Sequence, residues 1–231
     1  MTTYYKVLHA DGSCFHGGKG SWPLPTEDGP GEWVEVKGDL VACENGLHGC
    51  RIGDLFEWFG PAIFVMEFEG EVVTSADKAL GRKARLVRAT AWNSSTARLF
   101  AADCAERALK RERKAGREPD ARSWEAVRVA RAFARGEATS EDLAAAWDAA
   151  GATAWATARV TTGATAGAAA RAAARVTAWD AAGDAARAAA RAAAWDAARD
   201  AARATARAAA RAADRRWQIK RLTEYLDGKR P

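Results

Sequence analysis

In the first 93 residues, apolar side chains come in short runs of β-forming residues, and turn residues separate these runs. Residues 3–9 and 32–37 combine Val with Tyr or Trp, which predicts two strands joined by a long loop rich in Gly and Pro. Along residues 63–74 the apolar side chains fall on both alternating faces. We therefore expect a central strand that is covered on both sides.

Shorter elements complete this region: a brief strand at 40–42, a short helix at 53–59, a turn at 75–78 and a last strand at 84–92. Together the runs predict a small α+β domain with a mixed β-sheet over residues 1–93. Its expected core consists of Leu8, Val34, Val36, Leu55, Phe59, Ile63, Val65, Phe68, Leu86 and Val87.

Beyond residue 93, the apolar spacing changes to the three- and four-residue intervals of amphipathic helices. The run Asn93-Ser94-Ser95 supplies N-cap oxygens for a helix over residues 96–114, and a second helix follows through Ala134. We interpret residues 94–139 as a helical connector. Residues 140–231 are predicted to form an all-α, Ala-rich region.

A four-residue repeat governs the Ala-rich region. Every fourth position from 147 to 215 holds Trp, Arg or Gly and never Ala, whereas the position before it is almost always Ala. Four residues turn an α-helix by about 400°, so such a column moves about 40° around the helix at each step. One straight helix cannot keep the column on one face, and we expect separate helices broken at Gly163, Gly167 and Gly183.

The repeated column displays cationic and aromatic side chains, which makes it the candidate partner-binding surface. A structural or self-associating role is favoured, because Ala columns require close helix approach and Trp supplies apolar area. Interleaved Arg and Trp also suit a surface that tracks a phosphate backbone, and a solvated helix face is a further alternative. The candidate residues are Trp147, Trp155, Trp179, Trp195, Arg187, Arg191, Arg199, Arg203, Arg207 and Arg211.

Composition limits the classes of function only weakly. The net charge of +5 favours acidic partners but is lower than that of dedicated nucleic-acid-binding arms. Residues 1–10 form a polar, strand-like start unlike a signal peptide, so for the four cysteines we expect a reducing, cytoplasmic environment. A membrane span is not expected, because every apolar stretch of about 18 residues contains a charge.

Thiol and imidazole side chains gather early in the chain and form the candidate metal site. Four of them could ligate Zn²⁺ tetrahedrally, yet their spacing matches none of the common zinc-finger patterns. Free cysteines are among the most buried residue types, so structural thiols and a turn histidine are favoured over zinc, and catalysis is the third alternative. The candidate residues are Cys14, His16, Cys43, His48 and Cys50.

Residues 15–20 (FHGGKG) form a Gly-rich stretch whose backbone N–H groups suit phosphate, although the spacing is not that of a P-loop. The stretch resembles the His-Gly that opens the nicotinamide pocket of ADP-ribosyltransferases, and residues 46–68 resemble the strand, helix and strand that follow there. The resemblance implies NAD as a cofactor and makes His16 and His48 weak catalytic candidates. The acidic catalytic residue of those enzymes has no match on the last predicted strand. Other carboxylates nearby are those of Glu67, Glu69 and Glu71.

Residues 43–50 (CENGLHGC) resemble a family of uncharacterised bacteriophage and prophage proteins that carry C-E-N-G-(Leu or aromatic)-H-x-C. In that family a short helix, an apolar strand, a Gly-Glu-Val-like turn and a Lys-containing segment follow, and here these are residues 54–59, 63–68, 70–72 and 77–78. The resemblance covers residues 4–92, and Ala-rich helical extensions accompany some members. It implies a phage protein in the bacterial host cytoplasm, without an assigned activity.

The sequence therefore predicts an α+β domain (1–93), a helical connector (94–139) and a helical repeat array (140–231). We expect a non-enzymatic interaction or assembly protein of phage origin, which forms a homo-oligomer or binds a protein partner through the array, without a cofactor. Two alternatives stay open. One is an ADP-ribosyltransferase-like enzyme in residues 1–93, and the other is an electrostatic nucleic-acid binder that uses the Arg/Trp column.

Overall fold

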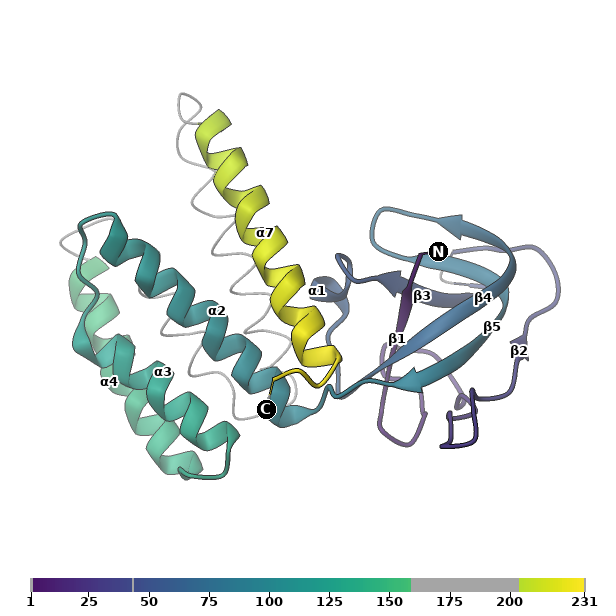
Figure 1. Cartoon of the computed structure of the whole chain (residues 1–231), viewed down its shortest axis with the longest axis horizontal. Coiled ribbons are helices and arrows are strands. Elements are labelled where there is room, and N and C mark those ends of the chain that lie inside the picture. Colours follow the sequence, from purple (N-terminus) through teal and green to yellow (C-terminus); the bar gives the residue numbers. More distant parts are fainter. Residues whose placement is uncertain (1, 43, 159–203, 231) are drawn as a thin grey trace. The chain divides into compact units, whose positions relative to one another are not determined.

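The computed structural model describes residues 2–42, 44–158 and 204–230, and it combines a small closed sheet with helices in a mixed α+β architecture (Figure 1). The chain divides into two compact units. The first comprises Met1–Asn93 together with Thr223–Pro231, and the second comprises Ser94–Leu222.

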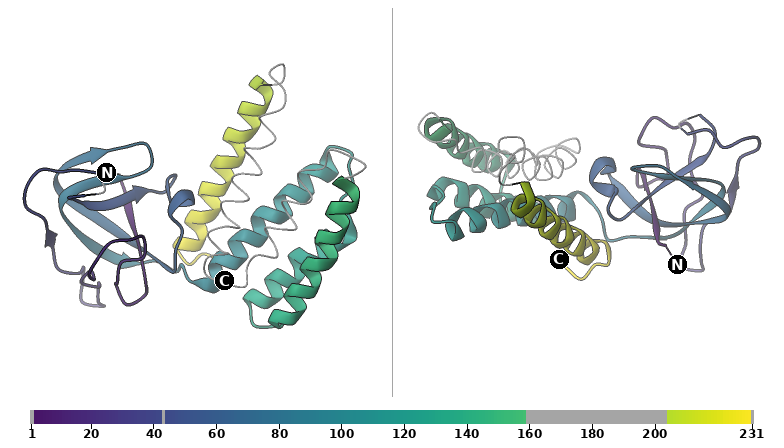
Figure 2. Two further views of the ribbon diagram at one scale, coloured as in Figure 1. Left: turned by 180° about the vertical axis from the view of Figure 1, so that it is seen from behind. Right: turned by 90° about the horizontal axis from the view of Figure 1, so that it is seen from above.

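Five strands form the sheet of the first unit: β1 (Tyr4–Leu8), β2 (Val34–Glu35), β3 (Leu47–Arg51), β4 (Ala62–Thr74) and β5 (Ala79–Ala89). Their order is β2-β5-β3-β1-β4, and β4 pairs with β5 as well. This additional pairing closes β1, β3, β5 and β4 into a ring, which two further views show from other sides (Figure 2). All the pairings are antiparallel.

One part of the core of the first unit lies on one face of these strands, and Val7 and Ile63 are buried on the other face. Successive side chains of a strand point to opposite faces, so Tyr4, Lys6 and Leu8 share a face of β1. Leu8 is fully buried in a cluster with Phe64 and Met66 of β4, and Tyr4 packs against the same cluster. The remaining buried members of that cluster are Trp22, Leu47, Ala84 and Leu86.

A second packed group holds the short helix α1 (Leu55–Trp58) against the end of the sheet region. The rings of Phe59 and Trp92 stack at 4.9 Å between centroids with an interplanar angle of 11°. The indole Nε1 of Trp92 donates to the carbonyl of Gly60 at 3.0 Å. The position of α1 therefore depends on the stacking of Phe59 with Trp92, which follows β5.

The end of the chain also belongs to the first unit. The backbone N–H of Ala91 donates to the carbonyl oxygen of Leu226 at 3.0 Å, and Arg88 pairs with Asp227 at 3.5 Å. Both Tyr225 and Leu226 are buried.

The second unit contains α2 (Ser94–Lys114), α3 (Ala121–Ala134), α4 (Ser140–Ala158) and most of α7 (Ala204–Leu226) (Figure 1). Its buried cluster is built largely from alanine and valine on α2, α3 and α4, around Leu109 and Leu143. Such small side chains let helices approach closely. Asp120 caps α3, because its carboxylate accepts the backbone N–H of Arg122 at 2.8 Å.

Charged and aromatic side chains join α7 to α2. Asp214, which is buried, accepts hydrogen bonds from Arg107 at 3.0 Å and from Arg111. The guanidinium groups of Arg107 and Arg221 lie over the ring of Trp217, at 4.5 and 5.1 Å from its centroid. In contrast to the α2–α3–α4 cluster, this contact relies on ion pairs and cation–π contacts.

Most of the predicted elements are present. The strands expected at 3–9, 32–37 and 63–74 are confirmed by β1, β2 and β4, and the helices expected at 53–59 and 96–114 are confirmed by α1 and α2. The last predicted strand, 84–92, is β5, which begins five positions earlier at Ala79. In the expected core, Val34, Val36, Val65, Phe68 and Val87 are only half-buried.

The strand predicted at 40–42 is wrong. Val41 forms only an isolated bridge with Asn45, and the side chain of Asn45 donates to the carbonyls of Lys37 and Asp39 at 2.8 and 2.9 Å. These side-chain hydrogen bonds fold the segment into a turn, which competes with strand pairing. The strand that follows it, β3, was not predicted from the apolar pattern, although the resemblance of residues 46–68 to a strand, helix and strand implied one there.

The predicted helix breaks at Gly163, Gly167 and Gly183 lie outside the described residues. Of the Ala-rich region, the structure describes α4 at its start and α7 at its end. Among the described helices, none combines the length and the apolar character that crossing a bilayer requires.

Candidate functional site

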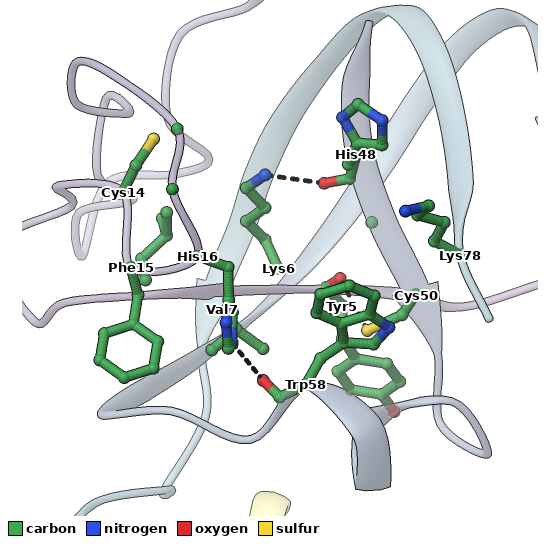
Figure 3. Close-up of a pocket in the computed structure, with 14 residues that line it drawn as sticks. Tyr5, Lys6, Val7, Cys14, Phe15, His16, His48, Cys50, Trp58 and Lys78 are labelled. Atoms are coloured by element: carbon green, nitrogen blue, oxygen red, sulfur yellow. Dashed lines mark hydrogen bonds between the residues drawn. The ribbon is translucent and has the colours of Figure 1, made fainter. Parts of the chain in front are cut away.

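A cavity of about 280 Å³ lies in the first unit, beside β1 and β3 (Figure 3). Five segments line it: residues 5–8 of β1, residues 14–18 of the Gly-rich loop, residues 48–50 of β3, Trp58 at the end of α1, and Lys78 between β4 and β5. Segments far apart in the sequence thus converge on one site.

The cavity lies where β1 and β3 separate. The two strands pair only through Tyr4 with Arg51 and Tyr5 with Cys50. At the next position along, the Nζ of Lys6 donates to the carbonyl oxygen of His48 at 2.8 Å, as Figure 3 shows. A lysine side chain therefore satisfies a carbonyl of β3 beyond the point where the backbone pairing ends.

Lys6 occupies a position that the sheet otherwise fills with apolar side chains. In the register of β1 and β4 it lies opposite Phe64, which is buried. Its Nζ also lies 4.9 Å from the centroid of the Trp22 ring, a cation–π distance. Burial lowers the pKa of Lys6 below its ordinary value, because the charged form loses its hydration.

The described lining of the cavity contains basic side chains and no acidic ones. In the described part of the chain, the lining contains Lys6, Lys78, His16 and His48 and no Asp or Glu side chain. No ion pair joins Lys6 to a carboxylate among the described residues either. An anion that enters the cavity would therefore find cationic groups without competing carboxylates in its lining.

Trp58 forms an aromatic wall, and backbone hydrogen bonds fix its position. Its Nε1 donates to the carbonyl of Asp77 at 3.0 Å, and the Nζ of Lys78 lies 5.2 Å from the ring centroid. Its own carbonyl oxygen contacts the Nε2 of His16 at 2.8 Å. The Lys78 turn, α1 and the Gly-rich loop are thus connected through one residue.

Glycine is required in the Gly-rich loop. Gly17 and Gly20 have φ angles of 78° and 89°, which side chains with a Cβ rarely adopt. A Cβ on Gly18 would lie 3.1 Å from the Sγ of Cys14. The aromatic rings of Phe15 and His16 meet edge to face at 4.7 Å, and they extend the wall begun by Trp58.

His48 is half-buried and lies near both lysines. Burial first, and then the charges of Lys6 and Lys78, lower the pKa of its imidazole below the ordinary value. A contact with the backbone of Gly46 opposes this effect in part. His48 is therefore neutral at neutral pH.

The structure brings four of the five candidate metal ligands to the same cavity, because Cys14, His16, His48 and Cys50 all line it. Even so, no three His, Cys, Asp or Glu side chains of the described residues are placed to hold one metal ion, and Cys43 lies outside those residues. Burial raises the pKa of Cys50 to about 12, so this thiol stays protonated at neutral pH.

The two histidines of the ADP-ribosyltransferase resemblance, His16 and His48, also share the cavity. The carboxylates considered for that chemistry do not reach it. Glu67 pairs with Arg85 at 2.5 Å, Glu69 pairs with Lys83 at 2.7 Å, and Glu71 is exposed near the β4–β5 turn. None of the three lines the cavity.

The candidate partner-binding residues lie apart from this cavity in the sequence. Trp147 and Trp155 belong to α4, and Arg207 and Arg211 belong to α7. Trp147 is half-buried, and its Nε1 has no hydrogen-bond partner among the described residues. The remaining candidates lie outside the described residues: Trp179, Trp195, Arg187, Arg191, Arg199 and Arg203.

Sequence reasoning missed three residues of the site: Lys6, Trp58 and Lys78. For Lys6 a signal was present, because in YYKVL the lysine occupies the alternating position that Tyr4 and Leu8 place on the core-facing side. Lys78 and Trp58 meet only because the β4–β5 turn lies against α1, and no local pattern predicts that contact.

Comparison with protein-family models, with curated proteins and with solved structures finds no match to this chain. The interpretation of the site therefore depends on its own geometry and chemistry.

Proposed function

We propose that the first unit binds a small organic anion with an aromatic or apolar body. The observation that carries the proposal is the lining of the cavity: Lys6 and Lys78 supply cationic groups, Trp58 and Phe15 supply aromatic rings, and no carboxylate lies among the described lining residues. Few polar groups in a mostly apolar pocket are typical of small-molecule sites. The volume of about 280 Å³ suits a small ligand.

The desolvation of Lys6 supports an anionic ligand. A partly desolvated ammonium group without an opposite charge is costly, and a bound carboxylate or phosphate would offset that cost. Hydrogen bonds to charged groups are worth about 1.5–3 kcal/mol each, so one lysine has a measurable effect on affinity. Because the lining lacks a carboxylate for acid–base chemistry, we favour binding over the transferase-like alternative.

Titration calorimetry with a matched pair of compounds tests this function. 3-Phenylpropionate carries a carboxylate and a phenyl ring, whereas 3-phenylpropanamide has the same shape without the charge. We expect the anion to bind the full chain and the amide not to bind. In Lys78→Ala the affinity for the anion should fall about tenfold, which corresponds to about 1.4 kcal/mol.

Lys83→Ala is the matched control. Lys83 lies over the ring of Trp33 at 5.1 Å, much as Lys78 lies over Trp58 at 5.2 Å, but it does not line the cavity. The two variants therefore remove the same charge and the same kind of aromatic contact. Equal loss of affinity in both, equal binding of the amide, or no binding of the anion would each contradict the proposal.

For the Ala-rich array we propose self-association, in the phage-assembly role that the resemblance of residues 43–50 suggests. Trp147 on α4 supports this, because its half-buried indole offers apolar area that a further helix can cover. Binding of nucleic acid through the Arg column is the competing proposal.

A deletion within the array tests self-association. Removal of residues 159–203 leaves α7 in place, which matters because Ala91 donates to Leu226 and the chain end belongs to the first unit. Light scattering should give an oligomer for the full chain and a monomer for the deletion variant. The same mass per particle in both proteins would refute self-association through the array.

A further inference from the structure

Lys6 is unusual because it lies on the core-facing side of a strand, where apolar side chains are expected. Its neighbours on that face, Tyr4 and Leu8, pack in or against the core cluster, and its partner across the strand pair, Phe64, is buried. A lysine at such a position has a cost in stability relative to an apolar residue. A residue that costs stability and lines a cavity is a candidate for chemistry.

Burial favours an uncharged amine at Lys6 and outweighs its two contacts, which favour the charged form. The described residues offer its Nζ a carbonyl oxygen, that of His48, and the face of an aromatic ring, that of Trp22, and no carboxylate. Burial lowers its pKa, which is the same change that activates lysine nucleophiles in apolar pockets. An amine that donates one N–H to a carbonyl keeps its lone pair for another partner.

We propose that Lys6 condenses with the carbonyl carbon of a small organic anion, of the 2-oxo acid class, to form a reversible imine. The inference rests on the proposed function, because the carboxylate of such a ligand is recognised by the cationic lining. Lys78, from another segment of the same lining, is the residue we assign to the carboxylate. The aromatic rings of Trp58 and Phe15 would contact the apolar end of the ligand.

The condensation balances without a redox partner. The lone pair of the Lys6 Nζ attacks the carbonyl carbon, and a proton moves from nitrogen to the former carbonyl oxygen to give a carbinolamine. The C–O bond then breaks as the remaining proton on nitrogen passes to the hydroxyl, the oxygen leaves as water, and a C=N bond forms. We assign the transfer of these protons to the imidazole of His48, which lines the same cavity and whose backbone carbonyl accepts from the amine.

Reductive trapping tests the imine on the full chain. The protein is incubated with phenylpyruvate and sodium cyanoborohydride, which reduces an imine to a stable secondary amine, and modified peptides are located by mass spectrometry. We expect one dominant adduct on Lys6 that adds the mass of phenylpyruvic acid less one oxygen atom, because condensation removes one water and reduction adds two hydrogens. An excess of 3-phenylpropionate should suppress it.

Variants identify the residue. Lys6→Arg keeps the charge and can donate to the carbonyl of His48, but it cannot form an imine, so the adduct should disappear. Lys78→Ala keeps the Lys6 amine, and its labelling should fall about tenfold with the affinity for the anion. Lys83→Arg, outside the cavity, should be labelled at Lys6 as the unmodified protein is. Peptide mapping of the unmodified protein decides the question even if Lys6→Arg does not fold.

The outcomes separate this inference from the proposed function. Binding of 3-phenylpropionate without preferential labelling of Lys6 overturns the imine and leaves anion binding intact. Labelling spread evenly over the surface lysines overturns it as well. In a third outcome, Lys6 is labelled preferentially, but 3-phenylpropionate neither binds nor suppresses the labelling. This outcome would support the reactive amine and overturn the proposed function.

Discussion

Replacing Asp103 with alanine is expected to lower the free energy of unfolding of the helical unit by about 3 kcal/mol, since removing one partner of a buried ion pair leaves the other charge uncompensated. Asp103 is only 9% exposed. Its Oδ1 accepts from Arg131 of α3 at 2.7 Å, and its Oδ2 pairs with Arg221 of α7 at 3.1 Å. One carboxylate on α2 therefore contacts two other helices of this unit.

Urea denaturation followed by circular dichroism measures this loss. Glu137→Ala is the control, because Glu137 pairs with Arg135 at 2.8 Å on an exposed surface and such pairs are worth about 0–1 kcal/mol. Arg131 keeps a second partner, Glu106, at 2.8 Å, and loss of the pair with Arg221 should weaken the attachment of α7. Equal losses in Asp103→Ala and Glu137→Ala would show that the buried network does not hold α7.

The sequence allowed the elements of the first unit to be predicted where their signals are local. Apolar residues on both faces of 63–74 predicted β4, and Gly60-Pro61 ended α1 as expected. β3 could not be predicted in this way, because LHGCR has His, Gly and Arg among only two apolar side chains and shows no regular alternation. Gly49 is needed there since a Cβ would lie 2.4 Å from the Sδ of Met66, a requirement set by tertiary packing.

The candidate site was predicted in part. The thiol and imidazole residues singled out from the sequence, Cys14, His16, His48 and Cys50, do converge on one cavity. These residues share a recognisable chemistry as metal ligands, whereas no motif marks the lysines, which carry the charge of the site. Lys6 meets His48 because β1 and β3 diverge after Tyr5, and divergence of two strands leaves no trace in either strand's own sequence.

The contact of α7 with α2 could not be predicted for a similar reason. Asp214 and Arg107 are more than a hundred residues apart, and Asp214 follows a run of Arg and Ala in which it looks like any helix-surface charge. Its burial and its two arginine partners emerge only when both helices are in place. Long-range ion pairs of this kind are set by the fold.

Replacing Trp92 with alanine is expected to cost about 4 kcal/mol of unfolding free energy in the first unit, the usual range for removing a buried aromatic side chain. Trp92 is 4% exposed, and it stacks on Phe59, which follows α1 directly. Its loss removes that stacking and leaves the carbonyl of Gly60 without the indole donor. The effect should reach the cavity, because Trp58 is adjacent to Phe59 and forms the aromatic wall.

Two comparisons separate these contributions. Trp92→Phe keeps a ring on Phe59 but loses the hydrogen bond to Gly60 and part of the buried indole, so it should cost about 1–3 kcal/mol. Trp33→Ala removes a half-buried indole that lies over Arg85, away from the cavity, and should leave the binding of 3-phenylpropionate unchanged. Urea denaturation gives the stabilities, and calorimetry gives the affinities under conditions where each variant is folded.

The order of the affinities carries the argument about the site. If the Phe59–Trp92 stack positions α1, binding should weaken most in Trp92→Ala, less in Trp92→Phe and not at all in Trp33→Ala. A folded Trp92→Ala protein that binds the anion as tightly as the unmodified chain would mean that Trp58 is held by its own hydrogen bonds to Asp77 and His16. The aromatic wall would then belong to the β4–β5 turn and the Gly-rich loop, and its support would not come from the residues that follow β5.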